Sequence, residues 1–161
     1  MTYLKIIITI LLFSNFLNPA FAEKYQGHFK VGNPYKIEDV TYHPEIDKNY
    51  QEAGYASWYG DAFANKKTAN GEIFYPKEIS AAHRTLPLPS MVLVTNLENG
   101  KELKLKVNDR GPFAHDRIID LSRKAATILG FKHKGTALVE VKFLKDGPEK
   151  LHKELFGKAQ F

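Results

Sequence analysis

Four titratable side chains in three stretches of the sequence are the candidates for chemistry. Glu72 follows a glycine in the polar stretch 68–72, His83 follows two alanines, and Asp109 and Asp120 each come at the end of an apolar run. A carboxyl group that faces an apolar layer has its charged form disfavoured and its pKa raised, which is the condition for a general acid. The sequence therefore offers acid–base chemistry, with Asp109 as the first candidate for the acid.

Each candidate taken singly also has a structural explanation. Asp109 precedes the Gly-Pro pair at 111–112 and could cap a turn. Asp120 lies near a predicted helix start, where a carboxylate favours the positive end of the helix dipole. Glu72 could be a surface glutamate, and His83 a hydrogen-bonded structural histidine. The residue types alone leave both explanations open.

A predicted hairpin positions the first acid. Apolar residues alternate with charged ones over 102–108, which predicts a half-buried strand, and 91–96 predicts its partner. The segment 97–100 between them ends in Asn-Gly, which supplies the positive-φ residues of a tight turn. The same alternation sends Asp109 to the side of the leucines and Arg110 to the other, so Arg110 is not automatically the ion-pair partner of Asp109.

The other predicted elements are short. Residues 54–60 are rich in strand formers and predict a first strand, and 137–143 alternate and predict a last one. A hydroxyl cap at the start and a glycine at the end predict a short helix over 122–130. Asp-Gly-Pro at 146–148 opens another helix. Several strands, little helix and many turns indicate a small, mostly β barrel or sandwich.

The ends of the chain suggest export. Residues 1–22 have one lysine, an apolar run too short for a membrane span and a small-x-small end, as in a cleaved signal peptide. Residues 23–52 mix aromatic, proline, glycine and charged residues without a period and predict an extended arm. We expect the barrel domain over 53–145 and a short helical tail over 146–161.

Composition excludes several classes of site. Residues 1–22 hold one of the 23 basic residues and no acid, which leaves 22 basic and 18 acidic residues and a formal net charge of +4, so we expect no nucleic-acid partner. The chain has no cysteine, and its six histidines make no close ligand pair, so we expect no metal site and no disulfide. Trp58 and Tyr59 could stack on a sugar ring or fill a core, and the core is favoured for Trp58.

Five motifs in one order give the chain a resemblance to a known family. They are GYASWYG at 54–60, KTANGE at 67–72, AAHRTLPLPS at 81–90, VNDRGPF at 107–113 and RIIDLS at 117–122. This set resembles the rare lipoprotein A family of bacterial envelope proteins, over most of the chain after residue 22. The resemblance implies a six-stranded double-psi β-barrel, with one or two short helices.

The resemblance also implies an activity. The family is similar to lytic transglycosylases, lyases that act endolytically on peptidoglycan. They cut the β-1,4 bond between N-acetylmuramic acid and N-acetylglucosamine and leave 1,6-anhydro-muramyl ends without a cofactor. Members prefer strands stripped of stem peptides and are linked to cell-wall remodelling and daughter-cell separation. Glu72, His83 and Asp109 match the implicated active-site positions, and Asp120 matches an essential aspartate of expansin-like relatives. We expect Trp58, Tyr59 and Arg110 to contact the glycan.

Other interpretations follow from the same residues. A non-catalytic expansin-like module would bind or loosen glycan without cutting it, and a septal interaction protein is the least supported class. Typical members of the family carry a lipid-modified cysteine and many carry a C-terminal SPOR domain; the sequence has no cysteine and ends at Phe161, so we expect no lipid anchor. We expect an exported monomer in the periplasm or envelope of a Gram-negative-type bacterium, with glycan strands as its partner and no stable membrane span.

Overall fold

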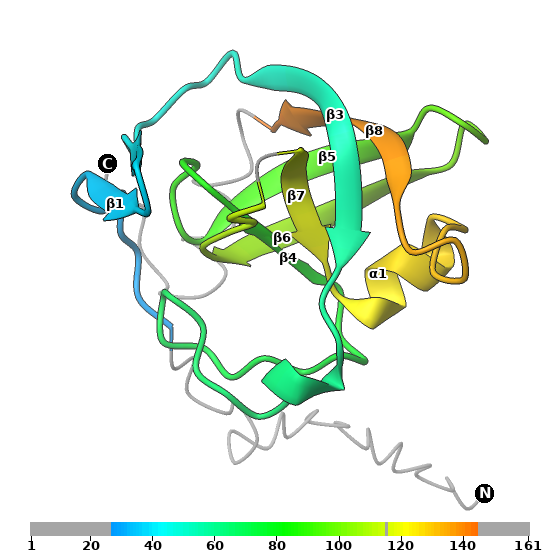
Figure 1. Cartoon of the computed structure of the whole chain (residues 1–161), viewed down its shortest axis with the longest axis horizontal. Helices are drawn as coiled ribbons and strands as arrows, with labels where there is room; N and C mark the ends of the chain where they lie inside the picture. The colour runs from blue at the N-terminus through cyan, green and yellow to red at the C-terminus, as the bar shows by residue number, and fades with distance from the viewer. Residues whose placement is uncertain (1–26, 115, 145–161) are drawn as a thin grey trace, which may run out of the picture.

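Six strands close into a barrel in the computed structural model, which describes residues 27–114 and 116–144. Around the barrel the order is β3-β7-β4-β6-β5-β8 (Figure 1). The strands are β3 (Gln51–Trp58), β4 (Ser80–His83), β5 (Ser90–Asn96), β6 (Glu102–Asp109), β7 (Arg117–Leu121) and β8 (Ala137–Phe143). The pairs β3·β7 and β4·β6 are parallel and the other pairs are antiparallel. This closed, mixed barrel confirms the predicted mostly β class and the six-stranded double-psi β-barrel.

Alternating apolar side chains fill the barrel. On β5 and β8 every second residue is buried, so these strands show the two-residue period that their sequences predict. Burying a valine, leucine or isoleucine side chain contributes about 1.5–3 kcal/mol to folding. The fully buried branched residues are Leu86, Leu88, Val92, Val94, Leu105, Val107, Ile119, Leu121, Leu129, Val139 and Val141.

The predicted hairpin is confirmed, but its turn differs. β5 and β6 pair in register from Ser90↔Val107 to Thr95↔Glu102. Only Gly100 of this turn has a positive φ, of 73°, whereas Asn99 does not. The Asn99 side chain instead accepts a hydrogen bond from the Lys101 amide at 2.9 Å and donates one to the Leu129 carbonyl at 3.0 Å. The turn is therefore held by hydrogen bonds of the Asn99 side chain, and not by a positive φ at Asn99.

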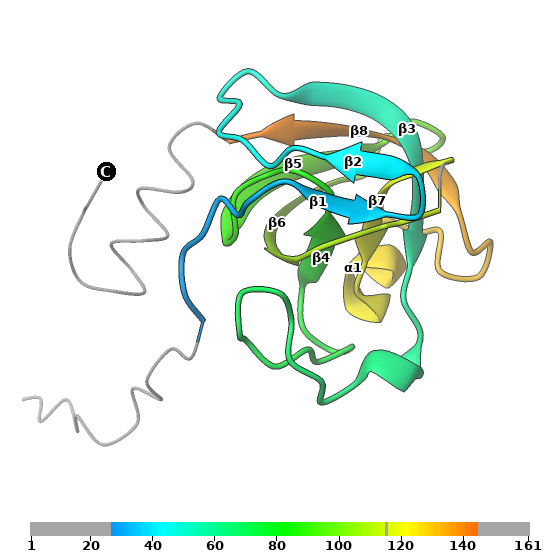
Figure 2. The same cartoon turned by 60° about the vertical axis from the view of Figure 1, so that its left-hand side comes forward.

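The predicted helix and first strand are present with shifted ends. α1 (Arg123–Ile128) is capped by Ser122, whose hydroxyl accepts from the Ala125 amide, and Gly130 follows it with a φ of 82°. β3 begins three residues before the predicted strand because Gln51 already pairs with Lys142 of β8. The loop between β3 and β4, with a 3-10 turn at Asp61–Phe63, extends beyond one end of the barrel (Figures 1 and 2).

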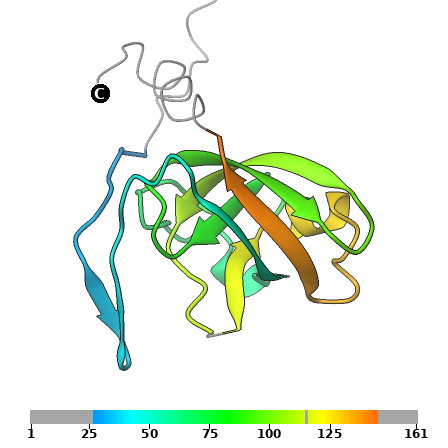
Figure 3. The ribbon, with the colours of Figure 1, turned by 90° about the horizontal axis from the view of Figure 1, so that it is seen from above.

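The described part of the arm lies against the barrel. It forms a small hairpin of β1 (Tyr35–Ile37) and β2 (Val40–Tyr42), which stands to one side of the barrel (Figures 1 and 3). Backbone hydrogen bonds join Lys30 to Leu88 in both directions, at 2.7 and 2.8 Å, and the Glu45 amide to the Thr85 carbonyl at 3.1 Å. These bonds fix the arm to the connection between β4 and β5.

Two predictions fall on other parts of the chain. The signal peptide over 1–22 and the helical tail over 146–161 lie outside the described residues. Within the described ranges no helix has the length and apolar character needed to cross a membrane.

Candidate active site

Asp109 ends β6 with its carboxylate held by backbone amides. Its Oδ1 accepts hydrogen bonds from the Ala69 and Arg110 amides, both at 2.8 Å. Burial raises the pKa of Asp109 above its ordinary value, although these two amides and the nearby Arg110 and Lys30 cations act in the opposite direction. A carboxyl with a raised pKa and fixed orientation is suited to protonate a bound substrate.

The alternation of β6 does not carry through to this residue. The pairing of β4 with β6 shifts register between Ala81↔Val107 and Ala82↔Asp109, so a strict two-residue period is interrupted. Val107 and Asn108 are both buried, and Asp109 is half-buried. The hydrogen bonds to Ala69 and Arg110, and not alternation alone, therefore set the direction of the carboxylate.

Asp109 and Asp120 flank the same residue of the barrel. Ala82 of β4 pairs with Asp109 of β6 on one side and with Asp120 of β7 on the other. This pairing places the two acids at the same level of the barrel, while the direction of the Asp109 side chain is set by its hydrogen bonds to the Ala69 and Arg110 amides. Neighbouring strands are about 4.8 Å apart, so the two backbones lie roughly 10 Å apart and their side chains can converge on one ligand.

Asp120 is a half-buried acid and not the cap of the helix. The N-cap of α1 is Ser122, whereas Asp120 lies in β7 two residues before it. Asp120 faces Arg117 Nη1 at 3.4 Å, and its Oδ1 accepts no well-formed hydrogen bond from the described residues. Burial raises the pKa of Asp120, with Arg117 acting to lower it and Asp116 to raise it.

Tyr59 lies within electrostatic range of both acids. Its ring packs on Phe74 at a centroid distance of 4.5 Å and on Phe63 at 6.0 Å. Burial raises its pKa well above the ordinary value, and Asp109 and Asp120 raise it further. Its hydroxyl is buried and has no hydrogen-bond partner among the described residues. A neutral phenol between two acids is therefore available as a donor to a ligand or to either carboxylate.

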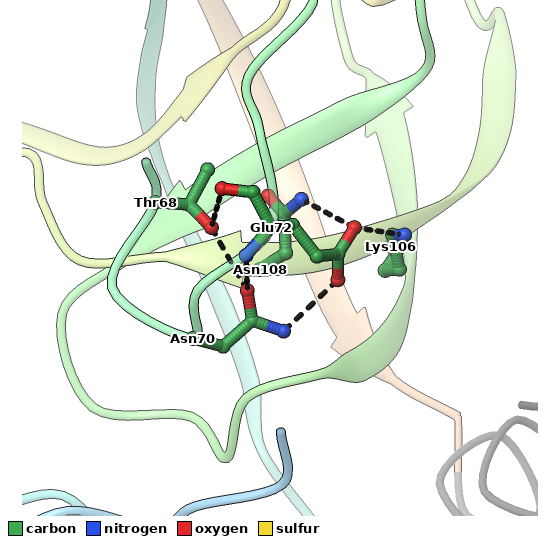
Figure 4. Close-up of polar contacts among 5 residues, drawn as sticks. All are labelled: Thr68, Asn70, Glu72, Lys106 and Asn108. Atoms are coloured by element: carbon green, nitrogen blue, oxygen red, sulfur yellow. Dashed lines mark hydrogen bonds and ion pairs between the residues drawn. The ribbon is translucent and has the colours of Figure 1, made fainter. Parts of the chain in front are cut away.

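Glu72 belongs to a polar network with Thr68, Asn70, Lys106 and Asn108 (Figure 4). Gly71, with a φ of 92°, allows the turn in which the Thr68 amide donates to the Glu72 carbonyl at 2.8 Å. Glu72 Oε2 accepts from Lys106 Nζ in a short ion pair and from Asn108 Nδ2 at 3.1 Å.

The network continues through the same turn. Asn70 Nδ2 donates to Glu72 Oε1 at 2.9 Å, and the Thr68 hydroxyl donates to Asn70 Oδ1 at 2.8 Å. Both carboxylate oxygens of Glu72 are thus bound by protein groups, and its side chain is only 13% exposed. Glu72 is placed to hold the 68–72 turn, whose Ala69 amide binds Asp109.

His83 lies inside the protein. Its Nδ1 accepts from the Thr85 and Leu86 amides at 3.2 and 3.1 Å, so the proton belongs on Nε2, which donates to the Tyr50 hydroxyl at 2.8 Å. Burial lowers the pKa of His83 to about 3, and Arg84 and Arg110 lower it too. The ring is therefore neutral, and both of its nitrogens are occupied by protein groups.

Arg110 clamps the arm, and Trp58 packs inward. Arg110 Nη1 donates to the His83 and Leu86 carbonyls at 3.3 and 2.6 Å, and Nη2 donates to the Val31 carbonyl at 2.6 Å. The hydrogen bonds of the Arg110 guanidinium therefore go to backbone carbonyls and not to the Asp109 carboxylate. Trp58 packs against the core and donates to the Lys132 carbonyl at 3.1 Å. Of the predicted glycan contacts, the structure brings only Tyr59 close to both acids.

Sequence reasoning missed the partners of Glu72. Lys106 was interpreted as the polar side of an alternating strand, and Asn108 only as part of a turn motif. A lysine and an asparagine two residues apart share one face of a strand, and this spacing is the signal that could have found them. Among the described residues no group of three or more histidines, cysteines or acids could hold a metal ion.

The chain is similar in sequence to proteins of a known family. Residues 51–141 match the family model described as "Lytic transglycolase". Proteins named "Endolytic peptidoglycan transglycosylase RlpA" are 52% identical over 134 residues in Rickettsia felis and 53% identical over 118 residues in Pseudomonas aeruginosa strain UCBPP-PA14. These alignments cover 81% and 73% of the chain and 59% and 34% of the relatives. The chain thus spans less than two thirds of the length of these relatives.

A solved structure shares the fold. The Streptomyces papain inhibitor superposes with a TM-score of 0.50 at 20% identity, over 62% of the chain and 99% of the inhibitor. At this identity the likeness concerns the fold alone.

Proposed function

Because the chain belongs to the lytic transglycolase family, we propose that it cuts peptidoglycan glycan strands endolytically between N-acetylmuramic acid and N-acetylglucosamine. The product would carry a 1,6-anhydro-muramyl end, as in a lyase reaction, and peptide-free strands would be the preferred substrate. The observation that carries the proposal is the placement of Asp109 and Asp120 on either side of Ala82, with the pKa of both acids raised.

Asp109 has the acid and then the base role in this proposal. Its protonated carboxyl donates to the glycosidic oxygen while the bond from that oxygen to the muramic C1 breaks. The same carboxylate then takes the proton of the muramic C6 hydroxyl, whose oxygen closes on C1. The proton lost in the first step is regained in the second, and no water is consumed.

The remaining residues support this acid. Asp120 as a carboxylate would stabilise the positive charge that develops near C1. Tyr59 would donate a hydrogen bond to the sugar or to an acid. Glu72 and His83 act as positioning residues. Glu72 holds the turn that binds Asp109, and the His83 ring accepts from the Thr85 and Leu86 amides and so fixes the loop whose carbonyls bind Arg110.

The experiment is mass spectrometry of purified sacculi digested with the protein. Soluble muropeptides with anhydro ends support the lytic transglycosylase, and reducing ends would identify a hydrolase instead. Absence of soluble product together with binding to sacculi would favour the expansin-like alternative. We also propose that the protein works in the cell envelope, where its glycan substrate lies, in wall remodelling and cell separation.

A further inference from the structure

A pocket between the arm and the barrel takes no part in the proposed reaction. It has a volume of about 290 Å³, near the lower end for small-molecule sites, so it suits one sugar unit or its substituent. It is lined by Lys30, Gly32, Asn33, Tyr35, Pro44, Arg110 and Phe113. Arg110 follows Asp109 directly, so the pocket adjoins the candidate acid.

The pocket holds two cations that form no ion pair among the described residues, although the Asp109 carboxyl lies within electrostatic range of both. The hydrogen bonds of the Arg110 guanidinium go to three backbone carbonyls, which hold it in place without cancelling its charge. Lys30 is fixed by its backbone bonds to Leu88, and in the part of the chain that the structure describes no carboxylate pairs with its ammonium group. Two cations in one small pocket favour an anionic ligand.

Aromatic rings form another wall of the pocket. Tyr35 and Phe113 meet edge to face at 6.1 Å, and the Tyr35 hydroxyl is fixed by a hydrogen bond to the Arg84 carbonyl at 2.7 Å. The Phe113 side chain stays 39% exposed. Flat apolar faces beside a few polar groups suit the C–H faces and polar substituents of a sugar.

We propose that this pocket binds the carboxylate of an acidic sugar of the glycan, with Lys30 as the residue that selects it. In peptidoglycan this group is the lactyl carboxylate of a muramic residue without a stem peptide. When a stem peptide is attached, the same carbon is an amide and carries no charge. The proposal rests on the proposed function. It makes the arm part of the substrate site, because Lys30 is on the arm and lies outside residues 51–141, which match the family model.

The test measures binding and cleavage with two substrates. One is peptide-free glycan prepared by removing stem peptides with an amidase, and the other is the same glycan with its carboxylates reduced to alcohols. Binding of fluorescently labelled strands is measured by anisotropy on Asp109→Asn, which does not consume them. Cleavage is measured as anhydro ends formed by proteins with Asp109 intact.

Three substitutions isolate the charge at position 30. Lys30→Met removes it without touching the backbone bonds to Leu88, and Lys30→Arg keeps it. Lys36→Met is the matched control, because Lys36 is on the same arm but its side chain is 61% exposed and pairs with Asp39. All three proteins should fold as the unmodified chain does.

We expect Lys30→Met to bind the native glycan about tenfold more weakly and the reduced glycan unchanged. Lys30→Arg should restore the preference, and Lys36→Met should keep it. Equal binding of both glycans to Asp109→Asn with Lys30 intact, or a preference retained when Lys30→Met is added to it, would overturn the pocket assignment. Failure of the proposed function would give a different result, because no anhydro ends would form from either glycan. The binding comparison would still show whether the pocket binds the carboxylate.

Discussion

Replacing Asp109 by asparagine should remove catalysis and leave the fold intact. Asparagine has nearly the same shape, and its Oδ1 can still accept hydrogen bonds from the Ala69 and Arg110 amides. It cannot give a proton to the glycosidic oxygen or take one from the C6 hydroxyl. Loss of general acid–base catalysis costs about 10²- to 10⁴-fold in rate.

The stability of this variant follows from the pKa of Asp109. Burial raises that pKa, so the native state holds the proton more tightly than the unfolded chain does, and stability falls as the pH rises from the ordinary value through the raised value. Above both values the ionised Asp109 destabilises the native state. A neutral asparagine avoids this penalty, so at pH 7 its free energy of unfolding should be at least that of the unmodified chain.

Asp109→Ala is the informative comparison. It leaves the Ala69 and Arg110 amides without their acceptor, and each unpaired amide costs about 1–3 kcal/mol, less where water enters. We expect this variant to be roughly 2–4 kcal/mol less stable than Asp109→Asn in urea unfolding, and both to release few anhydro-muropeptides. Full release by Asp109→Asn would refute the assignment of the acid.

Three further predictions concern the residues around Asp109. The His83 ring signals in NMR should stay constant from pH 8 to pH 4, because its pKa is about 3. Since this pKa lies below that of the unfolded chain, the contribution of His83 to stability is lost as the pH falls from about 6.5 toward 3. A titration of the ring near pH 6.5 would contradict its buried, neutral state. Glu72→Gln and Lys106→Met should show a coupling free energy of about 1–2 kcal/mol in a double-mutant cycle of urea unfolding, because this ion pair is largely buried. Additive effects of the two substitutions would mean that the ion pair does not contribute to the free energy of unfolding. Arg110→Met should increase proteolytic cleavage within 27–50, identified by mass spectrometry of the fragments, because the Val31 carbonyl loses its hydrogen-bond donor. Arg84→Met is the control, because the Arg84 side chain does not bind the Val31 carbonyl. Equal cleavage of the two variants would contradict the role of Arg110 in holding the arm.

Elements with local signals were predictable from the sequence. The hairpin of β5 and β6, the helix at Arg123–Ile128 and the last strand depend on alternation, a serine cap and glycines within a few residues of each element. The detailed turn was wrong because the Asn99 side chain bonds to Leu129, thirty residues away. The start of β3 was missed because its pairing with β8 crosses most of the domain.

The candidate site depends on distant pairings. Asp109 and Asp120 could be named from motifs, but their placement around Ala82 is a matter of strand order and register, which no local pattern encodes. The Glu72–Lys106 pair joins residues 34 apart. In sequence, the lysine at 30 is one charge among many on an irregular arm, and only the fold places it beside Arg110.

The position of β8 in the barrel has a consequence for synthesis of the protein. β8 bonds to β5 on one side and to β3 on the other, so the ring is sealed by the barrel strand that is synthesised last among the described residues. Until then two strand edges lie open, each a template for pairing with another chain. Pairing between the first and last barrel strands also gives a high contact order, which slows folding to the range of milliseconds to seconds. A chain kept unfolded until its full length has been synthesised would avoid that exposed intermediate.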